Sequence, residues 1–320
     1  RIFLRKAQNH PSIQVAAIND LADASVLAYL FQYDSVHGRF SGAVRAEEDQ
    51  LWVDEQCIQI LQKKDPSELP WKALNIDVVI ESSGKYKNQE SCQKHLNSGA
   101  KRVILSAPPS DEHIPMHLIG VNEDSISLSD KIISNASCTT NSCAHIIQEM
   151  DKLAGIDKMM LTTVHSFTND QTLHDQSHKD LRRARAATKS MIPTTTGAIR
   201  ALKLLFPDLN QKLHGGAIRV PVENGSISEM TFLTNKTVQV EVVNAHFANL
   251  AEGRLKGILS YTSDPIVSVD IIGNRHSAIF DSGLTMGLGN MLRISTWYDN
   301  EAGYSSRLVD HLERYDRLLS

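Results

Sequence analysis

Short apolar runs bounded by polar turn residues dominate the first 135 positions. The runs at residues 13–18, 77–81 and 102–106 predict strands, and each is followed by turn-forming residues such as Asn, Asp, Ser, Gly or Pro. Between them, residues 1–9 and 88–97 have helical spacing, and the second of these helices is expected to end near Gly99. Strands that alternate with helices predict an α/β fold with a doubly wound parallel sheet.

The pattern changes after about residue 207. Alternating β-type segments follow one another, and they predict strands at residues 216–222, 229–235, 237–243, 266–272, 276–281 and 291–298. Such a series is typical of a mostly antiparallel sheet, so the second half is predicted to be α+β. A final helix is expected at residues 305–319, where Leu308, Leu312 and Tyr315 share one face.

Three polar residues fall where these predicted strands end. Asp20, Ser83 and Ser106 follow the strands at 13–18, 77–81 and 102–106. Ligands of doubly wound sheets bind beyond the carboxyl ends of the strands, so these residues are candidates for cofactor binding. A solvated turn aspartate is the alternative interpretation of Asp20.

Composition narrows the class of protein. The chain has 320 residues, enough for about two domains, and a formal net charge of -4 from 33 basic and 37 acidic side chains. That balance does not favour binding to nucleic acid or to a membrane surface. No apolar run approaches the roughly 18 residues of a membrane span, and no signal peptide is visible. With only four scattered cysteines, the sequence predicts a cytoplasmic protein with free thiols.

Cys138 has the most reactive predicted environment. A short strand at 132–134 leads through small polar residues to Cys138, and a helix over residues 142–153 follows, with Gly155 as its stop. This order places Cys138 at or near the first turn of the helix. Free backbone N–H groups and the helix dipole favour a thiolate there, so Cys138 is a candidate nucleophile. Cys143 lies a turn deeper and is expected to be an inert core residue.

A thiolate nucleophile needs a proton acceptor, and His165 is the candidate because it ends the strand predicted at 159–164. A zinc site built from Cys138, Cys143, His145 and His165 is the metal alternative. Neither a Cys-x2-Cys nor a His-x3-His spacing supports it, so no metal site is predicted.

Several motifs together resemble one enzyme family. Ser-Asn-Ala-Ser-Cys-Thr-Thr-Asn at residues 134–141 resembles the active-site signature of phosphorylating glyceraldehyde-3-phosphate dehydrogenases. Further matching blocks, in the family's order, lie at residues 33–40, 165–171, 178–187, 192–197, 217–221 and 297–301. The resemblance therefore runs nearly from end to end.

The resemblance implies a Rossmann domain that binds NAD and a separate catalytic domain. Residues 1–136 with the last helix, 303–320, would form the first, and residues 137–302 the second. The family's first strand and Gly-rich turn have no counterpart in this sequence, and we expect about a dozen residues carrying them to precede Arg1. The segment at about 167–190 would cross a subunit interface, which implies a homotetramer.

The resemblance also implies a reaction, the oxidation of glyceraldehyde 3-phosphate to 1,3-bisphosphoglycerate. Cys138 would attack the aldehyde, His165 would act as the base, and inorganic phosphate would release the product from a thioester. The implied cofactor contacts are Asp20, Lys64, Ser83, Ser106, Asn300 and Tyr304. The substrate's phosphate would bind to Thr168, Asp170, Arg219 and Arg185, and the attacking phosphate to Ser137, Thr139, Thr196 and Gly197.

Two alternatives and one open choice remain. An erythrose-4-phosphate dehydrogenase is the enzyme alternative, although such enzymes tend to lack the Thr found here as Thr168. A non-catalytic binding protein on the same scaffold is the other. Asp20 favours NAD because a carboxylate repels the 2′-phosphate of NADP, whereas Ser177 is typical of relatives that accept NADP. We expect a preference for NAD with weaker use of NADP.

The chain departs from the family pattern at a few positions. Ser142 and His145 stand where the family usually has Cys and Pro, and Ala302 stands in place of a large residue. Residues 223–225, Glu-Asn-Gly, replace a Pro-Asn-Val-like run. None of these changes removes a predicted catalytic group.

Overall fold

The computed structural model describes residues 1–319 and separates into two compact units. Unit 1 contains Arg1–His117, Ser125–Asn135 and the chain from Leu308 onward. Unit 2 contains Leu118–Asp124 and Ala136–Arg307. Residues 118–124 and the first turns of the last helix, α7 (Ala302–Leu319), therefore group with unit 2.

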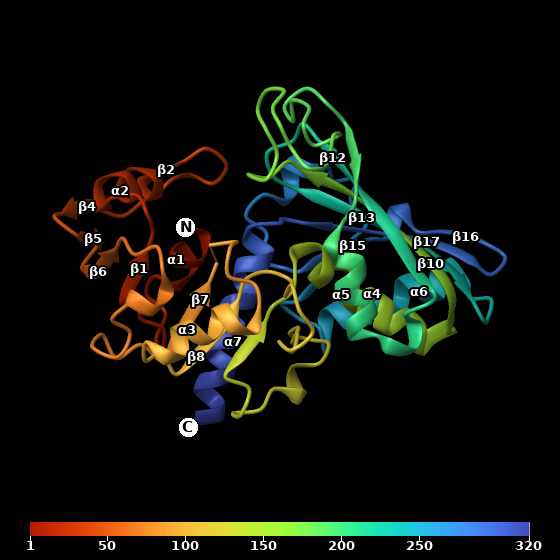
Figure 1. Cartoon of the computed structure of the whole chain (residues 1–320). Coiled ribbons are helices and arrows are strands. Elements are labelled where there is room, and N and C mark those ends of the chain that lie inside the picture. The colour runs from red at the N-terminus through yellow and green to blue at the C-terminus, as the bar shows by residue number, and fades with distance from the viewer. Residues whose placement is uncertain (320) are drawn as a thin grey trace. The chain divides into compact units, whose positions relative to one another are not determined.

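Unit 1 contains three sheets, one of them the two-stranded pair of β2 and β3 (Figure 1). Its helices are α1 (Ile2–Ala7), α2 (Ala24–Gln32), α3 (Gln89–Asn97) and the end of α7. Its strands are β1 (Ala17–Asn19), β2 (Tyr33–Asp34), β3 (Gly38–Arg39), β4 (Val44–Glu47), β5 (Gln50–Val53), β6 (Gln56–Leu61), β7 (Val78–Glu81), β8 (Arg102–Leu105) and β9 (Ile132–Ser134). One sheet has the order β1-β6-β5-β4, with β1 and β6 parallel; another is the all-parallel β7-β8-β9. The short β2 and β3 pair with each other.

The predicted helices and parallel strands of this unit are confirmed, but one strand is shifted along the chain. The strand predicted at 13–18 is found at Ala17–Asn19, which pairs in register with Gln59–Leu61 of β6. Helix α3 starts where Asn88 caps it, since the Asn88 Oδ1 accepts a hydrogen bond from the Ser91 backbone N–H at 2.9 Å. Its buried face carries Cys92 and His95.

Unit 2 is built on an eight-stranded mixed sheet (Figure 1). Its strands are β10 (Ile156–Ser166), β11 (Ile192–Thr194), β12 (Leu213–Val220), β13 (Ser226–Thr234), β14 (Leu259–Thr262), β15 (Ala278–Asp281), β16 (Met286–Leu288) and β17 (Met291–Tyr298). Its helices are α4 (Cys138–Ala154), α5 (Gly197–Leu205), α6 (Val240–Glu252) and the start of α7. The main order is β11-β12-β10-β13-β17-β15-β14, and all ladders except β10–β12 and β14–β15 are antiparallel. The predicted mostly antiparallel sheet is confirmed.

Two predicted strands are wrong. The segment at 237–243 starts helix α6, whose buried residues Val243, Phe247 and Ala251 recur every four positions. The valines at its start favour a strand locally, but the spacing of the later apolar residues selects a helix. The segment at 266–272 contains a 3₁₀ turn at Ser268–Ile271, in which the Asp270 carboxylate accepts from the Val267 N–H at 2.8 Å.

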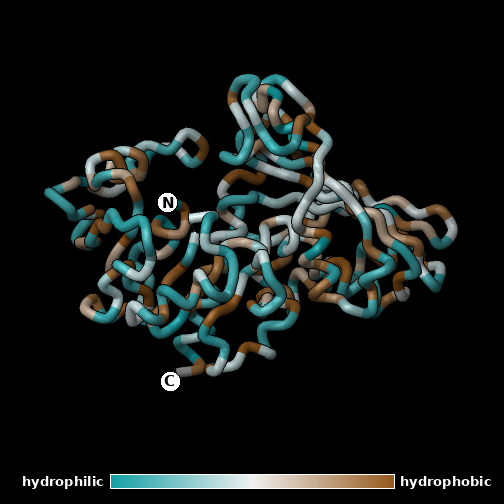
Figure 2. The backbone as a smooth tube through the Cα atoms, viewed as in Figure 1, coloured by the Kyte–Doolittle hydropathy of each residue, from teal (hydrophilic) through white to brown (hydrophobic). Residues whose placement is uncertain are grey.

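Hydrophobic and hydrophilic stretches are interspersed along the described backbone (Figure 2). Among the residues that the structure describes, no helix is both long enough and apolar enough to cross a membrane.

Candidate functional site

Cys138 is the first residue of α4, which begins four residues before the predicted start at 142 and places the thiol in the first turn, as predicted. Ser137 caps the helix, because its Oγ accepts from the Thr140 N–H at 3.1 Å. The preceding residue, Ala136, is buried and has a positive φ of 54°, a conformation that costs energy for a residue with a side chain. Its carbonyl oxygen accepts from the Tyr304 hydroxyl at 3.0 Å. The Ser137 cap, the turn at Ala136 and the hydrogen bond from Tyr304 together fix the position of the Cys138 thiol.

His165 lies beside this thiol. It belongs to the end of β10, and its Nε2 is 3.5 Å from the Cys138 Sγ. Its Nδ1 lies 2.7 Å from the carbonyl oxygen of Ser166, which can only accept, and 2.9 Å from the Arg219 Nη1, which can only donate. In the tautomer whose Nδ1 carries the proton and donates to the Ser166 carbonyl, the Nε2 lone pair faces the thiol, which is the arrangement a general base requires.

Desolvation shifts the pKa values of both members of this pair. It raises the pKa of the Cys138 thiol, against the opposing effects of the Arg219 charge and of the Thr139 and Cys138 N–H groups. Burial also lowers the pKa of His165 to about 3, and the Arg219 charge acts in the same direction. The helix N-terminus has the predicted effect on the thiol, but desolvation outweighs it. Both shifts favour the neutral forms, thiol and imidazole.

Arg219 connects His165 to the residues predicted to bind the substrate's phosphate. Its Nη1 is 2.9 Å from the His165 Nδ1 and donates to the Ser166 carbonyl oxygen at 2.9 Å and to the Thr168 Oγ1 at 3.3 Å. The Thr168 hydroxyl donates to the Asp170 carboxylate. Three predicted residues thus form one network beside the histidine.

Arg183, which sequence reasoning missed, completes this network. It is paired with Asp170 and donates from Nε to the Thr194 Oγ1 and from Nη2 to the Thr195 carbonyl oxygen, both at 3.0 Å. The predicted Arg185 is instead exposed and paired with Asp175 at 3.1 Å. The two arginines stand two positions apart in one loop, so only the path of that loop decides which one faces the network.

The residues predicted for the attacking phosphate gather at two helix starts. Thr196 caps α5 through its Oγ1, which accepts from the Ala198 N–H at 3.2 Å, and Gly197 follows with open space where a Cβ would be. Ser137 caps α4. The Thr139 hydroxyl is instead buried and bonded to the Tyr298 hydroxyl at 2.9 Å, which leaves its backbone N–H as the group for an anion.

Asn300 has a fixed orientation. Its Oδ1 accepts from the Ser166 Oγ at 2.9 Å, the Ser226 Oγ at 3.1 Å and the Gly225 N–H at 3.2 Å. Three donors on one oxygen leave the Nδ2 amide as the group that can bind a ligand carbonyl. Gly225 reaches this position with φ of 91°, and a Cβ there would lie 2.6 Å from the Ser268 carbonyl oxygen, so the departure to glycine suits the local backbone.

The predicted cofactor residues of unit 1 lie at strand ends. Asp20 is exposed, with one carboxylate oxygen accepting from the Ala22 N–H at 2.9 Å and the other without a partner in the described chain. The Ser83 N–H donates to the Glu81 carboxylate at 2.6 Å, the Ser106 N–H donates to the Glu81 carbonyl at 3.0 Å, and the Lys64 carbonyl accepts from the Tyr86 hydroxyl at 2.6 Å. Gly84, with φ of 75°, has open space where a Cβ would be.

The unit 1 groups suit a nucleotide, since a carboxylate acceptor can bind ribose hydroxyls and a glycine without a side chain permits close approach. Within unit 2, the oriented amide of Asn300 suits a carboxamide.

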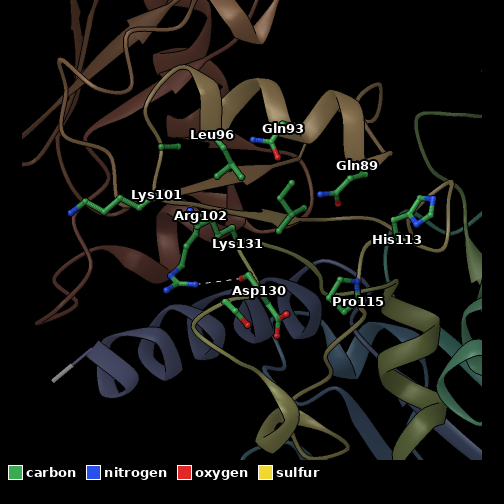
Figure 3. Close-up of a pocket in the computed structure, with 12 residues that line it drawn as sticks. Gln89, Gln93, Leu96, Lys101, Arg102, His113, Pro115, Asp130 and Lys131 are labelled. Carbon is green, nitrogen blue, oxygen red and sulfur yellow. Dashed lines mark hydrogen bonds between the residues drawn. The ribbon is translucent and has the colours of Figure 1, made fainter.

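A hollow of about 750 Å³ in unit 1 lies apart from these residues (Figure 3). Side chains of α3 and β8 line it, including Gln93 and Arg102. The Arg102 guanidinium is already engaged, since it donates to the Leu128 carbonyl at 2.9 Å and lies over the Tyr315 ring. None of the predicted site residues lines the hollow, and we assign it no role.

Parallel strands with ligand-type residues at their ends, and a histidine 3.5 Å from a thiol at a helix start, are typical of a nucleotide-dependent dehydrogenase that works through a thiol. In the described part of the chain, no group of three or more His, Cys, Asp or Glu is placed to hold a metal ion. Residues 1–89 match the NAD binding domain of glyceraldehyde 3-phosphate dehydrogenase, and residues 137–300 match its C-terminal domain.

Similar curated proteins cover nearly the whole chain. The glyceraldehyde-3-phosphate dehydrogenase of Thermotoga maritima is 52% identical over 313 residues, 98% of this chain and 93% of that protein. Glyceraldehyde-3-phosphate dehydrogenase 1 of Bacillus cereus is 46% identical, covering 97% and 93%, and the Mycobacterium avium enzyme is 47% identical, covering 97% and 91%. The chain belongs to the glyceraldehyde-3-phosphate dehydrogenase family. The predicted family, fold class and NAD cofactor are confirmed.

Proposed function

We propose that this protein oxidises glyceraldehyde 3-phosphate with NAD and inorganic phosphate to 1,3-bisphosphoglycerate. The observation that carries the proposal is the 3.5 Å approach of the His165 Nε2 to the Cys138 Sγ, with the Ser166 carbonyl oxygen 2.7 Å from the other ring nitrogen. Under this proposal Cys138 is the nucleophile and His165 the base.

The first step is attack of the Cys138 sulfur on the aldehyde carbon. His165 takes the thiol proton at Nε2 as the C–S bond forms, which avoids a free thiolate in a buried site. The new oxyanion lies near the N-terminal N–H groups of α4, and these stabilise it. The product of this step is a thiohemiacetal on Cys138.

Oxidation and phosphate transfer follow. A bound nicotinamide would supply the hydride acceptor, and loss of the hydride would convert the thiohemiacetal on Cys138 to a thioester. His165 receives the hydroxyl proton of the thiohemiacetal during this step, after its first proton has moved to the oxyanion. Phosphate held at the starts of α4 and α5 by Ser137, the Thr139 N–H, Thr196 and Gly197 then attacks the thioester carbon and displaces the cysteine sulfur.

Arg219 connects substrate binding to proton transfer. Its charge, 2.9 Å from the His165 Nδ1, lowers the pKa of that imidazole. The substrate's phosphate, bound by Arg219, Thr168 and Arg183, brings negative charge that offsets Arg219. His165 then becomes a stronger base when the substrate is present. Arg185, in its pairing with Asp175, contributes less to this site than Arg183.

The cofactor contacts are assigned within each unit separately. In unit 1, Asp20 binds ribose hydroxyls, and Ser83, Ser106 and Lys64 belong to the same set of strand ends. In unit 2, the Asn300 Nδ2 binds the carboxamide, and Tyr304 holds the Ala136 carbonyl beside it. This division corresponds to an NAD-binding domain and a catalytic domain.

The proposal includes a homotetramer. Three apolar side chains in or next to the 167–190 segment are strongly exposed, namely Leu173 at 65%, Leu181 at 82% and Met191 at 76%. Such exposure supports contact with another copy of the chain. Sedimentation analysis tests it, and a single monomeric species at micromolar concentration would contradict it.

The function is tested with the Cys138→Ser variant. A hydroxyl is a far poorer nucleophile at neutral pH, so we expect no phosphate-dependent NADH formation from glyceraldehyde 3-phosphate, with NAD binding retained. Near-normal activity would refute the role of Cys138. Faster turnover of erythrose 4-phosphate by the unmodified protein, independent of added phosphate, would favour the alternative dehydrogenase.

A further inference from the structure

A buried hydrogen-bonded chain in unit 1 ends at the turn after β7. The Trp71 Nε1 donates to the His95 Nδ1 at 3.0 Å, the His95 Nε2 is 2.9 Å from the Glu81 Oε2, and the Glu81 Oε1 accepts from the Ser83 N–H at 2.6 Å. Trp71, His95 and Glu81 are exposed by only 4%, 3% and 6%. We propose that Trp71, His95 and Glu81 are positioning residues that hold the turn at 82–85 in the conformation that binds the dinucleotide.

The indole fixes the tautomer of His95. An indole N–H can only donate, so the His95 Nδ1 must present its lone pair. The proton of the neutral imidazole is then on Nε2, where it donates to Glu81. Trp71 therefore affects the Glu81 carboxylate indirectly, by selecting the His95 tautomer that donates to it. Trp71 and His95 lie 24 positions apart in the sequence.

Glu81 keeps its negative charge in this setting. Burial opposes ionisation, but hydrogen bonds from His95 and Ser83 hold the pKa of the Glu81 carboxyl below its usual value. A buried carboxylate is costly when it loses a donor. The carboxylate therefore strongly favours the conformation in which the Ser83 N–H and the His95 Nε2–H both point at it.

The turn itself has few other constraints. The Lys85 N–H donates to the Ser83 Oγ at 3.2 Å, and Gly84 is open to solvent with φ of 75°. The Glu81 main-chain carbonyl also accepts from the Ser106 N–H. Glu81 thus holds two of the residues proposed to contact NAD, one through its side chain and one through its backbone.

The inference rests on the proposed role of Ser83 and Ser106 in NAD binding, and its test measures binding without catalysis. NAD is titrated calorimetrically into the full-length protein and into two variants, His95→Leu and His95→Gln. Leucine removes both hydrogen bonds, whereas a glutamine amide offers an acceptor for Trp71 and a donor for Glu81. We expect the Kd for NAD to rise about 10-fold in His95→Leu and to stay within about 3-fold of the original in His95→Gln.

The matched control is His113→Leu, which makes the same replacement at an exposed histidine of the same unit and should leave the Kd unchanged. Thermal unfolding of each variant shows that it is folded at the assay temperature. An unchanged Kd in folded His95→Leu would overturn the inference, and so would a folded His95→Gln that binds as weakly as His95→Leu.

A second variant keeps the test valid if His95→Leu does not fold. Trp71→Phe keeps an aromatic ring in the core and removes only the indole N–H, so the imidazole is free to change tautomer. We expect about a 3-fold weaker Kd, and an unchanged Kd would overturn the inference. When Trp71→Phe is assayed in saturating NAD, its kcat should remain near that of the unmodified protein. An unmodified protein that binds NAD but forms no NADH would refute the proposed function alone.

Discussion

His145 makes the folding stability of this protein sensitive to acid. The residue lies fully buried in α4, with its Nε2 2.9 Å from the Ile119 carbonyl oxygen. Burial lowers its pKa to about 4, and the charges of Arg307 and Arg254 act in the same direction. The folded protein therefore keeps this imidazole neutral through the mildly acidic range.

The direction of the pH effect follows from linkage. In the unfolded chain His145 has the ordinary pKa of about 6.5 and takes up a proton as the pH falls, while the folded state does not until about pH 4. The unfolded state thus gains proton-binding free energy first, and stability declines as the pH falls from about 6.5 towards 4. Between pH 7 and pH 5 the two pKa values give a loss of about 2 kcal/mol from His145 alone.

The His145→Gln variant isolates this contribution. The Gln amide can still donate to the Ile119 carbonyl but does not titrate. Urea unfolding at pH 7, 6 and 5, at one fixed protein concentration, should show a loss of stability about 2 kcal/mol smaller in His145→Gln than in the original protein. His165, whose pKa is also lowered, keeps some acid sensitivity in both.

His214→Gln is the control, because it makes the same replacement at an exposed histidine. It should lose stability in parallel with the unmodified protein. If His145→Gln also declines in parallel with the unmodified protein, His145 is not a buried neutral group and the reasoning fails.

Three further changes test the proposed site. His165→Asn should lower kcat at least about 10²-fold, the usual range for a general base, and a near-normal rate in stopped-flow NADH formation would contradict that role. Asp20→Ala should narrow or reverse the preference for NAD over NADP, measured as the ratio of the two steady-state kcat/KM values. A higher kcat/KM with NADP than with NAD in the unmodified protein would contradict the role of Asp20. Arg183→Lys should raise the KM for glyceraldehyde 3-phosphate several-fold because an ammonium cannot replace the donors to Asp170, Thr194 and Thr195, with the Kd for NAD as the unaffected control. If the KM of Arg183→Lys equalled that of the unmodified protein, Arg183 would not contribute to substrate binding.

The sequence by itself determined the features that depend on a few adjacent residues. Ser137 before Cys138 sets the start of α4, and Gly155, with φ of 67°, sets its end. The strand predicted at 291–298 has the same bounds as β17, because no turn-forming residue interrupts this run and Leu292, Ile294 and Tyr298 lie on one face of it. The nucleophile's place at a helix N-terminus could therefore be predicted without a fold.

Only the tertiary structure decided which side chains meet. Arg183 and Arg185 have the same chemistry and stand in one loop, and the pairing of Arg183 with Asp170 depends on that loop's path past β10. The Thr139 hydroxyl turns to Tyr298, 159 positions away, and not towards solvent. The desolvation that raises the pKa of the Cys138 thiol and lowers that of His165 is likewise a property of the packed unit. Local backbone preferences extend over about a helical turn, whereas desolvation and long-range hydrogen bonds exist only after distant strands have packed together.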